Sequence, residues 1–244
     1  MYIVPVVVAL LAQVVPAATQ PVGDVRRTYS FANDEAPAFA ATATGEAEKR
    51  NAQPKHAHGQ LYLMESWWQS TTSAAFPAPT DQRMRVIDAA WKLVMNTGTE
   101  GAGFVWLDVD KHGKEGAAPE CKEWEAPNFA GSFGVGFDAS NPPNRDPFRG
   151  SGNVYDRPQH EVSLHWDGLE IVKRTTPMEF RDEQPHEVKL HIEFVPGGAD
   201  ITLSMDDTAI YERYFIPSMT AYVGGRRSER GMRRRRAMCC STIW

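Results

Sequence analysis

Several short runs of this sequence alternate apolar and polar residues, and this period of two limits the possible fold more than any other feature. The clearest run is Glu187–Val195, in which every second residue from Val188 to Phe194 is apolar. Because successive side chains of a β-strand point to opposite faces, the run predicts a strand with one buried face. The same alternation occurs in Phe133–Asp138 and His160–Trp166. A chain built in this way is expected to bury its apolar residues between sheets.

Turn-forming residues, such as Asp167-Gly168 and Asp206-Asp207, separate the runs at intervals of about 8–12 residues, the spacing typical of sandwich folds. With no long helical segment between them, these hairpin signals predict an all-β, two-sheet antiparallel sandwich. Asn33–His58 is rich in Ala, Glu and Lys without a period, so we expect a surface loop there. Further strands are expected over Thr28–Phe31, Gln60–Glu65, Thr72–Phe76, Glu170–Arg174, Ile201–Met205 and Ala209–Phe215.

One segment, Arg83–Asn96, fits two patterns. Its apolar residues suit one face of a helix, but they also alternate cleanly from Ile87 to Met95, which fits a long strand. Glycines follow, and then Phe104–Val109 forms a second strand-like run. Two β runs joined by a glycine-rich turn make a hairpin the more economical interpretation.

The first residues of the chain predict export. Met1–Thr19 is an apolar run closed by small residues, which indicates a secretory signal peptide over residues 1–19. A short membrane anchor is the alternative, but Gln13 and Pro16 interrupt a run that is too short for a stable membrane span. We therefore expect a secreted or extracytoplasmic protein with one globular domain over residues 20–225.

Charge is distributed unevenly along the 244 residues. Residues 226–244 hold seven arginines against one glutamate, so the net charge of −5 conceals a charge of −11 on the rest of the chain. A body this acidic argues against nucleic-acid binding, which requires neutralisation of phosphates. Of the three cysteines only Cys121 lies in the body, so no disulfide framework can be inferred.

The basic tail over residues 226–244 interrupts the β pattern. A sandwich of this kind is expected to end with a strand beside the first one, Thr28–Phe31, and the tail lacks the alternation of such a strand. One hypothesis is that the tail is read in a shifted frame, because arginine codons rich in C and G become alanine and glycine codons when displaced by one base. The alternative is a genuine basic tail that contacts anionic surfaces. The nucleotide sequence of the gene decides between them.

An oxygen-rich loop joins two of the clearest strands. Between Phe133–Asp138 and His160–Trp166 the chain is dense in Asp, Asn, Pro and Gly, which bend the backbone and offer oxygen atoms. Calcium prefers about six to eight oxygen ligands, and this loop predicts a calcium site. The alternative is that the same residues cap turns beside Pro142 and Pro143. The predicted metal ligands are Asp138, Asn141, Asn144 and Asp146.

Two runs of the chain resemble motifs of the concanavalin A-like lectin/glucanase superfamily, especially its L-type lectin branch. They are Glu100–Phe104, which opens a strand, and Gly136–Asp138, which ends a strand in an acid before the loop. The later runs HEVSLHWDG and PHEVKLHIEF also resemble the second half of this superfamily. The resemblance extends over residues 28–224 and implies a jelly-roll sandwich that binds sugar at its rim.

The resemblance also implies roles for individual residues. The metal-ligating Glu of the family corresponds to Gly136, which has no side chain, so a transition-metal site is not expected. His160 is the candidate for the family's metal-loop His. The sugar-contacting Asp corresponds to Glu100, the calcium-binding Asp to Asp138, the loop Asn to Asn141 or Asn144, and the second Asp to Asp146.

The sequence therefore predicts an exported domain that binds a carbohydrate or glycoconjugate and catalyses no reaction. Trp106 is a candidate for stacking on a sugar ring, although alternating strand residues more often belong to the core. The glucanases of the superfamily carry a Glu-x-Asp-x-x-Glu run, and none occurs here. The alternatives are a glycan-processing hydrolase with carboxylates from separate strands, and an adhesion module without a sugar site. The predicted carbohydrate-binding residues are Glu100, Gly101, Asn141, Arg149 and Trp106.

Overall fold

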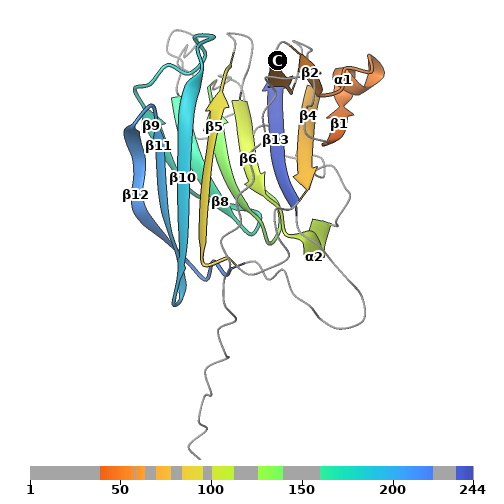
Figure 1. The fold of residues 1–244 in the computed structure, drawn as a ribbon. Coiled ribbons are helices and arrows are strands. Elements are labelled where there is room, and N and C mark those ends of the chain that lie inside the picture. The colour runs from red at the N-terminus through yellow and green to blue at the C-terminus, as the bar shows by residue number, and fades with distance from the viewer. Residues whose placement is uncertain are drawn as a thin grey trace, which may run out of the picture.

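The fold is a sandwich of two antiparallel sheets with a separate two-stranded hairpin (Figure 1). It is taken from a computed structural model that describes residues 39–57, 59–63, 70–77, 84–95, 101–112, 126–139, 160–221 and 235–243. The predicted all-β, two-sheet antiparallel sandwich is confirmed in these residues. The signal peptide expected over residues 1–19, the strand Thr28–Phe31 and Cys121 lie outside them.

The larger sheet contains seven strands in the described part of the chain. The turn between its strands β8 (His160–Trp166) and β9 (Leu169–Thr176) is the predicted two-residue hairpin. Its residues Asp167 and Gly168 have φ angles of 51° and 86°, as the tightest hairpin turns require. The strand order is β1 (Ala40–Thr44), β4 (Ser70–Pro77), β13 (Arg235–Ile243), β6 (Gly101–Trp106), β7 (Phe133–Asp138), β8 (His160–Trp166) and β9 (Leu169–Thr176).

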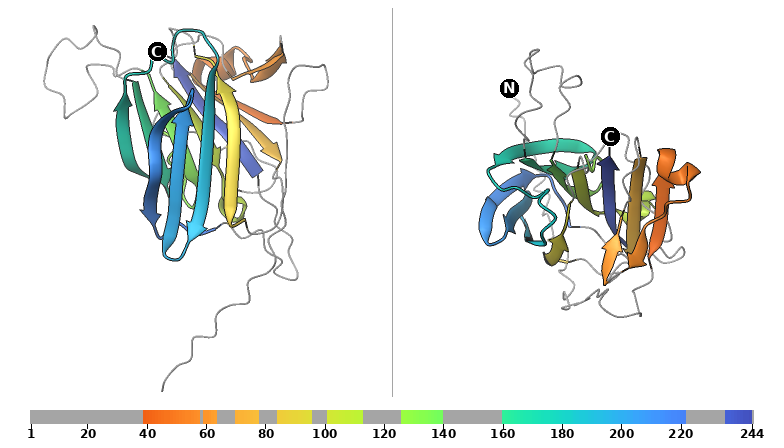
Figure 2. Two further views of the ribbon diagram at one scale, coloured as in Figure 1. Left: turned by 60° about the vertical axis from the view of Figure 1, so that its left-hand side comes forward. Right: turned by 90° about the horizontal axis from the view of Figure 1, so that it is seen from above.

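The smaller sheet packs against one face of the larger sheet (Figure 2). The segment Arg83–Asn96, which also fitted a helix, contains a strand from Val86 to Leu93 that pairs with β10 (His186–Val195). The preference for a strand is therefore confirmed. The hairpin expected between this segment and Phe104–Val109 is wrong, because β5 (Val86–Leu93) pairs in the smaller sheet whereas the strand Gly101–Trp106 pairs in the larger one. The order in this sheet is β12 (Thr208–Pro217), β11 (Gly198–Met205), β10 (His186–Val195) and β5 (Val86–Leu93).

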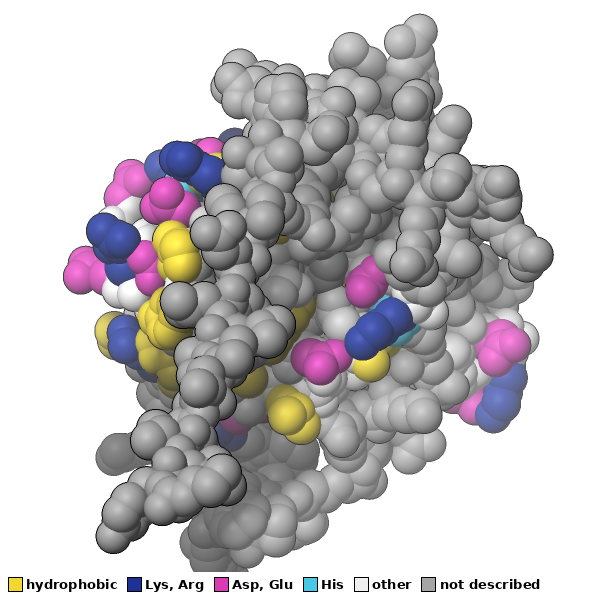
Figure 3. All heavy atoms as spheres, turned by 90° about the horizontal axis from the view of Figure 1, so that it is seen from below, with side chains coloured by type: hydrophobic (Ala, Val, Ile, Leu, Met, Phe, Trp, Pro, Cys, Tyr) yellow, Lys and Arg dark blue, Asp and Glu magenta, His cyan; other side chains and the backbone are white. Residues whose placement is uncertain are grey.

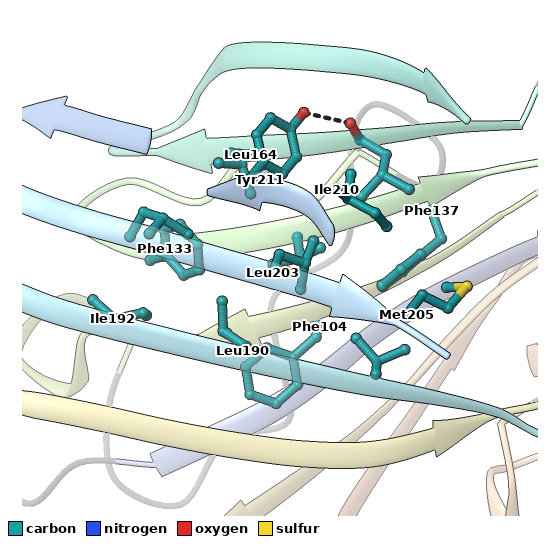
Figure 4. Packing of buried hydrophobic residues seen from close by; sticks show 14 of the residues in the cluster. Phe104, Phe133, Phe137, Leu164, Leu190, Ile192, Leu203, Met205, Ile210 and Tyr211 are labelled. Carbon is teal, nitrogen blue, oxygen red and sulfur yellow. Dashed lines mark hydrogen bonds between the residues drawn. The ribbon is translucent and has the colours of Figure 1, made fainter. Parts of the chain in front are cut away.

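The hydrophobic core lies between the two sheets. β7 contributes Phe133 and Phe137, β10 contributes Leu190 and Ile192, and all four side chains are buried. Figure 4 shows these side chains in the space between the facing sheets. Burying an apolar side chain of this size stabilises a fold by roughly 1.5–3 kcal/mol. The alternation in the sequence is therefore also the pattern that holds the two layers together.

The two sheets are joined along one side, where β9 meets β12. Arg174 donates a hydrogen bond of 2.7 Å to the carbonyl of Ile210, and its guanidinium lies 4.8 Å from the centre of the Tyr211 ring. The Tyr211 hydroxyl donates a hydrogen bond of 2.7 Å to the carbonyl of Val162 (Figure 4). Polar contacts therefore tie the smaller sheet to the larger one at this side.

A second apolar cluster lies on the outer face of the larger sheet, the face turned away from the smaller sheet. The covering segment, residues 126–132, crosses this face and buries Phe129 against Val105 and Ala75. A Cβ atom at Gly134 would lie 2.7 Å from the side chain of Pro127. Glycine at position 134 therefore lets the covering segment lie directly on β7.

The first described residues differ from the prediction of a loop over Asn33–His58. They contain β1, in which Ala43 is buried, and helix α1 (Gly45–Lys49), in which Ala47 is buried. The buried side chains of this segment are small alanines. The segment therefore lacks the large alternating apolar residues from which a strand is predicted. A short hairpin follows, formed by β2 (Lys55–Ala57) and β3 (Gln60–Tyr62).

The strand expected over Phe104–Val109 is shifted toward the glycines. β6 begins at Gly101 and ends at Trp106, and the short helix α2 (Val109–His112) follows. Pairing with β7 and β13 extends the strand through its glycines, because backbone groups pair across a sheet whatever the side chain.

The sequence places the tail outside the sandwich, and the structure differs. Arg235–Ile243 forms β13 inside the larger sheet, where Ala237 is the register partner of both Ala75 in β4 and Val105 in β6. A ladder of backbone hydrogen bonds does not require alternation, which explains how a tail without that pattern forms a strand. The hypothesis of a shifted reading frame stays a prediction.

Candidate functional site

The candidate site lies where β6, β7 and β8 meet at one end of the larger sheet. Gly101 opens β6 and is the register partner of Asp138, which closes β7. Asp138 is also the register partner of Glu161 in β8. Thr242 of β13 pairs with Gly101, so this is the top end in Figure 1, near the C label. We call Gly101, Asp138 and Glu161, together with Lys173 of β9, the Asp138 edge.

Strand alternation places Asp138 and Glu161 on the outer face of the larger sheet. Their neighbours Phe137 and Val162 are buried on the inner face, in the core. Directly opposed residues of an antiparallel pair have Cβ atoms about 4.5–5.5 Å apart. Two carboxylates therefore lie side by side, an arrangement that is unfavourable without a nearby cation.

Lys173 supplies that cation. Its Nζ atom lies 3.2 Å from Oε2 of Glu161, whose side chain is only 6% exposed. Partial burial works against a charged lysine, but the carboxylates of Glu161, Glu170 and Asp138 outweigh it and raise the pKa of Lys173. The edge is thus a set of carboxylates organised around one ammonium group.

Gly136 and its register partner Ser163 lie next to this edge on the outer face, and there is no room there for another acidic side chain. A Cβ atom at Gly136 would lie 2.5 Å from Oγ of Ser163 and 3.3 Å from Nε2 of His165. Any side chain at this position would displace that polar pair. Glycine at position 136 therefore leaves room for the Ser163 hydroxyl and the His165 ring.

Ser163, His165 and Asn128 form a hydrogen-bonded chain on the outer face. Nε2 of His165 lies 2.7 Å from the Ser163 hydroxyl, and Nδ1 lies 2.7 Å from Oδ1 of Asn128. Burial lowers the pKa of His165 to about 4, so the ring is neutral at pH 7. With Asn128 as acceptor, Nδ1 carries the proton and Nε2 accepts from Ser163.

This order of hydroxyl, imidazole and amide is also that of a nucleophile with its base. Here Ser163 is only 8% exposed and His165 is fully buried. The side chain of Pro127 lies over Gly136 beside the Ser163 hydroxyl. The chain of hydrogen bonds therefore fastens the covering segment to β8, and it offers no open nucleophile.

Of the predicted site residues, the structure brings Gly101 and Asp138 together. Trp106 is 2% exposed and packs in the core between the sheets, so its predicted stacking on a sugar is corrected. The reason is strand parity, because Trp106 and Gly101 lie on opposite faces of β6. The other predicted residues lie outside the described residues: Glu100, Asn141, Asn144, Asp146 and Arg149.

His160 is also turned away from the Asp138 edge. Its ring centre lies 4.8 Å from that of Phe180, and Nε2 lies 3.0 Å from Oε1 of Glu179. His160 lies on the same face of β8 as the buried Val162 and points into the core. Glu161 lies on the opposite face, at the Asp138 edge. The candidate match with the family's metal-loop His is therefore not supported by the position of its ring.

The described residues of the edge do not fit a calcium ion. Asp138 is the one predicted ligand among them, and Glu161 is already paired with Lys173. An ammonium group repels a dication and supplies no oxygen ligand. Within the described part of the chain, no group of three or more His, Cys, Asp and Glu side chains is placed to hold a metal.

The opposite end of the sandwich has a different character. It carries α2 and the turn between β8 and β9, and Lys111 lies 3.3 Å from Asp167 there. Figure 3 views the molecule from this side and shows described basic and acidic side chains near one another. No helix in the described ranges is long and apolar enough to cross a membrane.

Glu161, Lys173 and the Ser163–His165 pair were not predicted as site residues from the sequence. Alternation in HEVSLHW already places Glu161, Ser163 and His165 on one face, opposite the apolar residues. That pattern was available as a signal of a polar row. Lys173 could not be found in this way, because its position depends on the pairing of β8 with β9.

No family model and no curated protein matches the chain. Among solved structures, the VIP36 exoplasmic/lumenal domain in its Ca2+/Man3GlcNAc-bound form is 11% identical, with 91% of this chain and 84% of that chain covered and a TM-score of 0.49. The legume lectin-like domain from Entamoeba histolytica is 10% identical, with 83% and 82% covered and a TM-score of 0.45. The endo-1,3-beta-glucanase from Streptomyces sioyaensis is 11% identical, with 78% and 62% covered and a TM-score of 0.32.

Proposed function

We propose that this protein is an exported, non-catalytic domain that binds a carbohydrate or glycoconjugate at the Asp138 edge. The supporting observation is the pairing of Gly101 with Asp138. These residues come from the two runs that carry the sequence resemblance, and they are far apart along the chain. Export rests on the apolar run over residues 1–19, which lies outside the described residues.

The chemistry of the edge suits a polyhydroxylated ligand. Sugar hydroxyls both donate and accept hydrogen bonds, so a carboxylate acceptor and an ammonium donor on one face complement them. Asp138 supplies the acceptor and the partly exposed Lys173 supplies the donor. Glu100, Asn141 and Arg149 are proposed to complete the site from outside the described residues. We propose no role for calcium, because the described residues do not fit it.

A glycan-processing hydrolase has one observation in its favour. Asp138 and Glu161 are register partners on separate strands, and retaining glycosidases place two carboxyl groups about 5–5.5 Å apart. Glu161, however, is buried and faces Lys173. A carboxylate committed to an ammonium partner is poorly placed to protonate a leaving group or to attack a sugar. We therefore prefer the binding function.

A glycan array tests the proposal. The intact protein is expected to retain at least one class of glycan, and Asp138→Asn is expected to weaken that retention by about tenfold or more, as the loss of a charge-assisted hydrogen bond allows. Asp88→Asn is the matched control, because Asp88 is an exposed carboxylate on the smaller sheet. Full retention by Asp138→Asn would contradict the site.

Two measurements on the intact protein distinguish the proposed binding function from the rival functions. Turnover of a labelled oligosaccharide would favour the hydrolase. An adhesion module would retain no glycan at all, in the intact protein or in either variant. Both results would overturn the proposal of a carbohydrate-binding domain.

A further inference from the structure

Lys173 reaches the candidate site from a strand that is paired within the larger sheet. It lies in β9, where it is the register partner of Ser163. The hairpin turn at Asp167 and Gly168 fixes β9 beside β8. The ammonium group is thus delivered by the sheet itself, and its Nζ atom lies 3.2 Å from Oε2 of Glu161.

The carboxylates of the edge require a positive charge. Glu161 is 4% exposed, and a buried carboxylate is strongly unfavourable unless a cation or several donors compensate it. Asp138 lies directly across from it, which adds repulsion between like charges. Glu170 contributes a third carboxylate near Lys173. A cation beside these carboxylates offsets their mutual repulsion.

The described residues of the Asp138 edge offer too few oxygen ligands for a metal ion. Calcium requires about six to eight oxygen ligands, and the adjacent row is closed to a carboxylate because a side chain at Gly136 would collide with Ser163. A dication entering the edge would also meet the ammonium of Lys173, which is paired with Glu161. At a few ångströms this repulsion between positive charges is strong even at an effective dielectric constant of about 20.

We propose that the ammonium group of Lys173 is the built-in cation of the Asp138 edge, so that the edge is organised without a divalent metal. Lys173 pairs with Glu161 and offsets the charge of Asp138. This assignment concerns the site of the proposed function, and it depends on that function only where glycan retention is measured.

The test measures metal binding directly, with no glycan present. Tb3+ luminescence and calorimetric titration with Ca2+ are applied to the full chain. The intact protein is expected to bind Ca2+ no better than at millimolar concentration, and Ca2+ is expected to leave its melting temperature unchanged. Lys173→Met removes the charge and keeps most of the side-chain volume, so it is expected to bind Tb3+ at least about tenfold more tightly than the intact protein.

Two further variants sharpen the test. Lys173→Arg keeps the charge and is expected to behave as the intact protein does. Lys189→Met is the matched control, because Lys189 is 47% exposed and also lies between two carboxylates, Glu187 and Asp207, but on the smaller sheet. It is expected to gain no Tb3+ affinity.

Two results would overturn the inference. One is submillimolar Ca2+ binding by the intact protein, which needs no variant and is therefore unaffected by any loss of folding. The other is a folded Lys173→Met variant, verified by circular dichroism, with unchanged Tb3+ affinity. Failure of the glycan array would overturn the proposed function and leave these metal measurements intact. If glycan is retained, excess chelator is expected to leave the retention unchanged.

Discussion

At the scale of single residues, two buried histidines have pKa values shifted in opposite directions. Burial lowers the pKa of His165 to about 4. Burial also acts against a charged His186, but hydrogen bonds to Asp206 and Asp182 outweigh it and raise the pKa of that ring. The fold therefore prefers a neutral ring at one position and a charged ring at the other.

His165 predicts a loss of stability in mild acid. Its folded pKa lies below the usual value of about 6.5, so the unfolded chain binds the proton first as the pH falls. The stabilisation is present above pH 6.5 and is lost between about pH 6.5 and 4. Between pH 7 and pH 5 this residue is expected to account for about 2 kcal/mol of the lost free energy of unfolding. Urea titrations of the intact protein and of His165→Gln measure it.

His186→Gln is the control of opposite sign. A raised folded pKa gives stabilisation that is complete below the unfolded value and is lost as the pH rises through the folded value. The deficit of His186→Gln relative to the intact protein is therefore expected to be larger at pH 6 than at pH 8. The deficit of His165→Gln should instead be larger at pH 7 than at pH 5. Equal deficits at all pH values would contradict both assignments.

At the scale of elements, alternation predicted most of the sandwich because one face of each strand is buried. Phe133–Asp138 and His160–Trp166 form strands with the expected bounds. The same reasoning failed for β1, α1 and β13, in which packing or pairing does not depend on large alternating side chains. The order of the runs also misled for Arg83–Asn96, because β5 and β6 are consecutive along the chain but belong to different sheets.

The Lys173 contact could not be predicted, because β8 and β9 do not pair uniformly. The turn sets Trp166 opposite Leu169, and uniform pairing would then place Val172 opposite Ser163. An irregularity between Leu164 and His165 shifts the register, so that Lys173 takes this place. A shift of one residue exchanges the two faces of a strand. The charge balance of the site thus depends on a local irregularity that has no signal in the sequence.

β13 gives a prediction at this scale. Ala237 pairs with both neighbouring strands, so Ala237→Pro removes a backbone donor inside the sheet and is expected to destabilise the protein by about 3 kcal/mol or more. Ala237→Thr keeps the donor and suits a strand, so it serves as the control. Chemical denaturation measures both variants. A proline variant as stable as the threonine variant would show that Arg235–Ile243 is not an inner strand.

At the scale of the whole molecule, the sandwich is closed at one side by a polar clasp between β9 and β12. Arg174 reaches from the larger sheet to the Ile210 carbonyl and the Tyr211 ring. The Tyr211 hydroxyl adds a second polar contact at this side by donating to the Val162 carbonyl. Arg174→Met is expected to lower the free energy of unfolding by about 1 kcal/mol, since the carbonyl loses a charged donor.

Thermal unfolding of Arg174→Met checks this expectation against Arg213→Met. Arg213 pairs with Asp200 within the smaller sheet and is exposed, so its loss is expected to have little effect. If the two variants melt alike, the clasp between the sheets contributes nothing beyond an ordinary surface ion pair.

The inner position of β13 has a consequence for biosynthesis. The larger sheet cannot be completed until Arg235–Ile243 has left the ribosome, because this strand lies between β4 and β6 and is synthesised after both of them. Contacts between such distant parts of a chain form slowly, and unpaired strand edges invite association with other chains. The nascent protein is therefore expected to need chaperone protection through most of its translation.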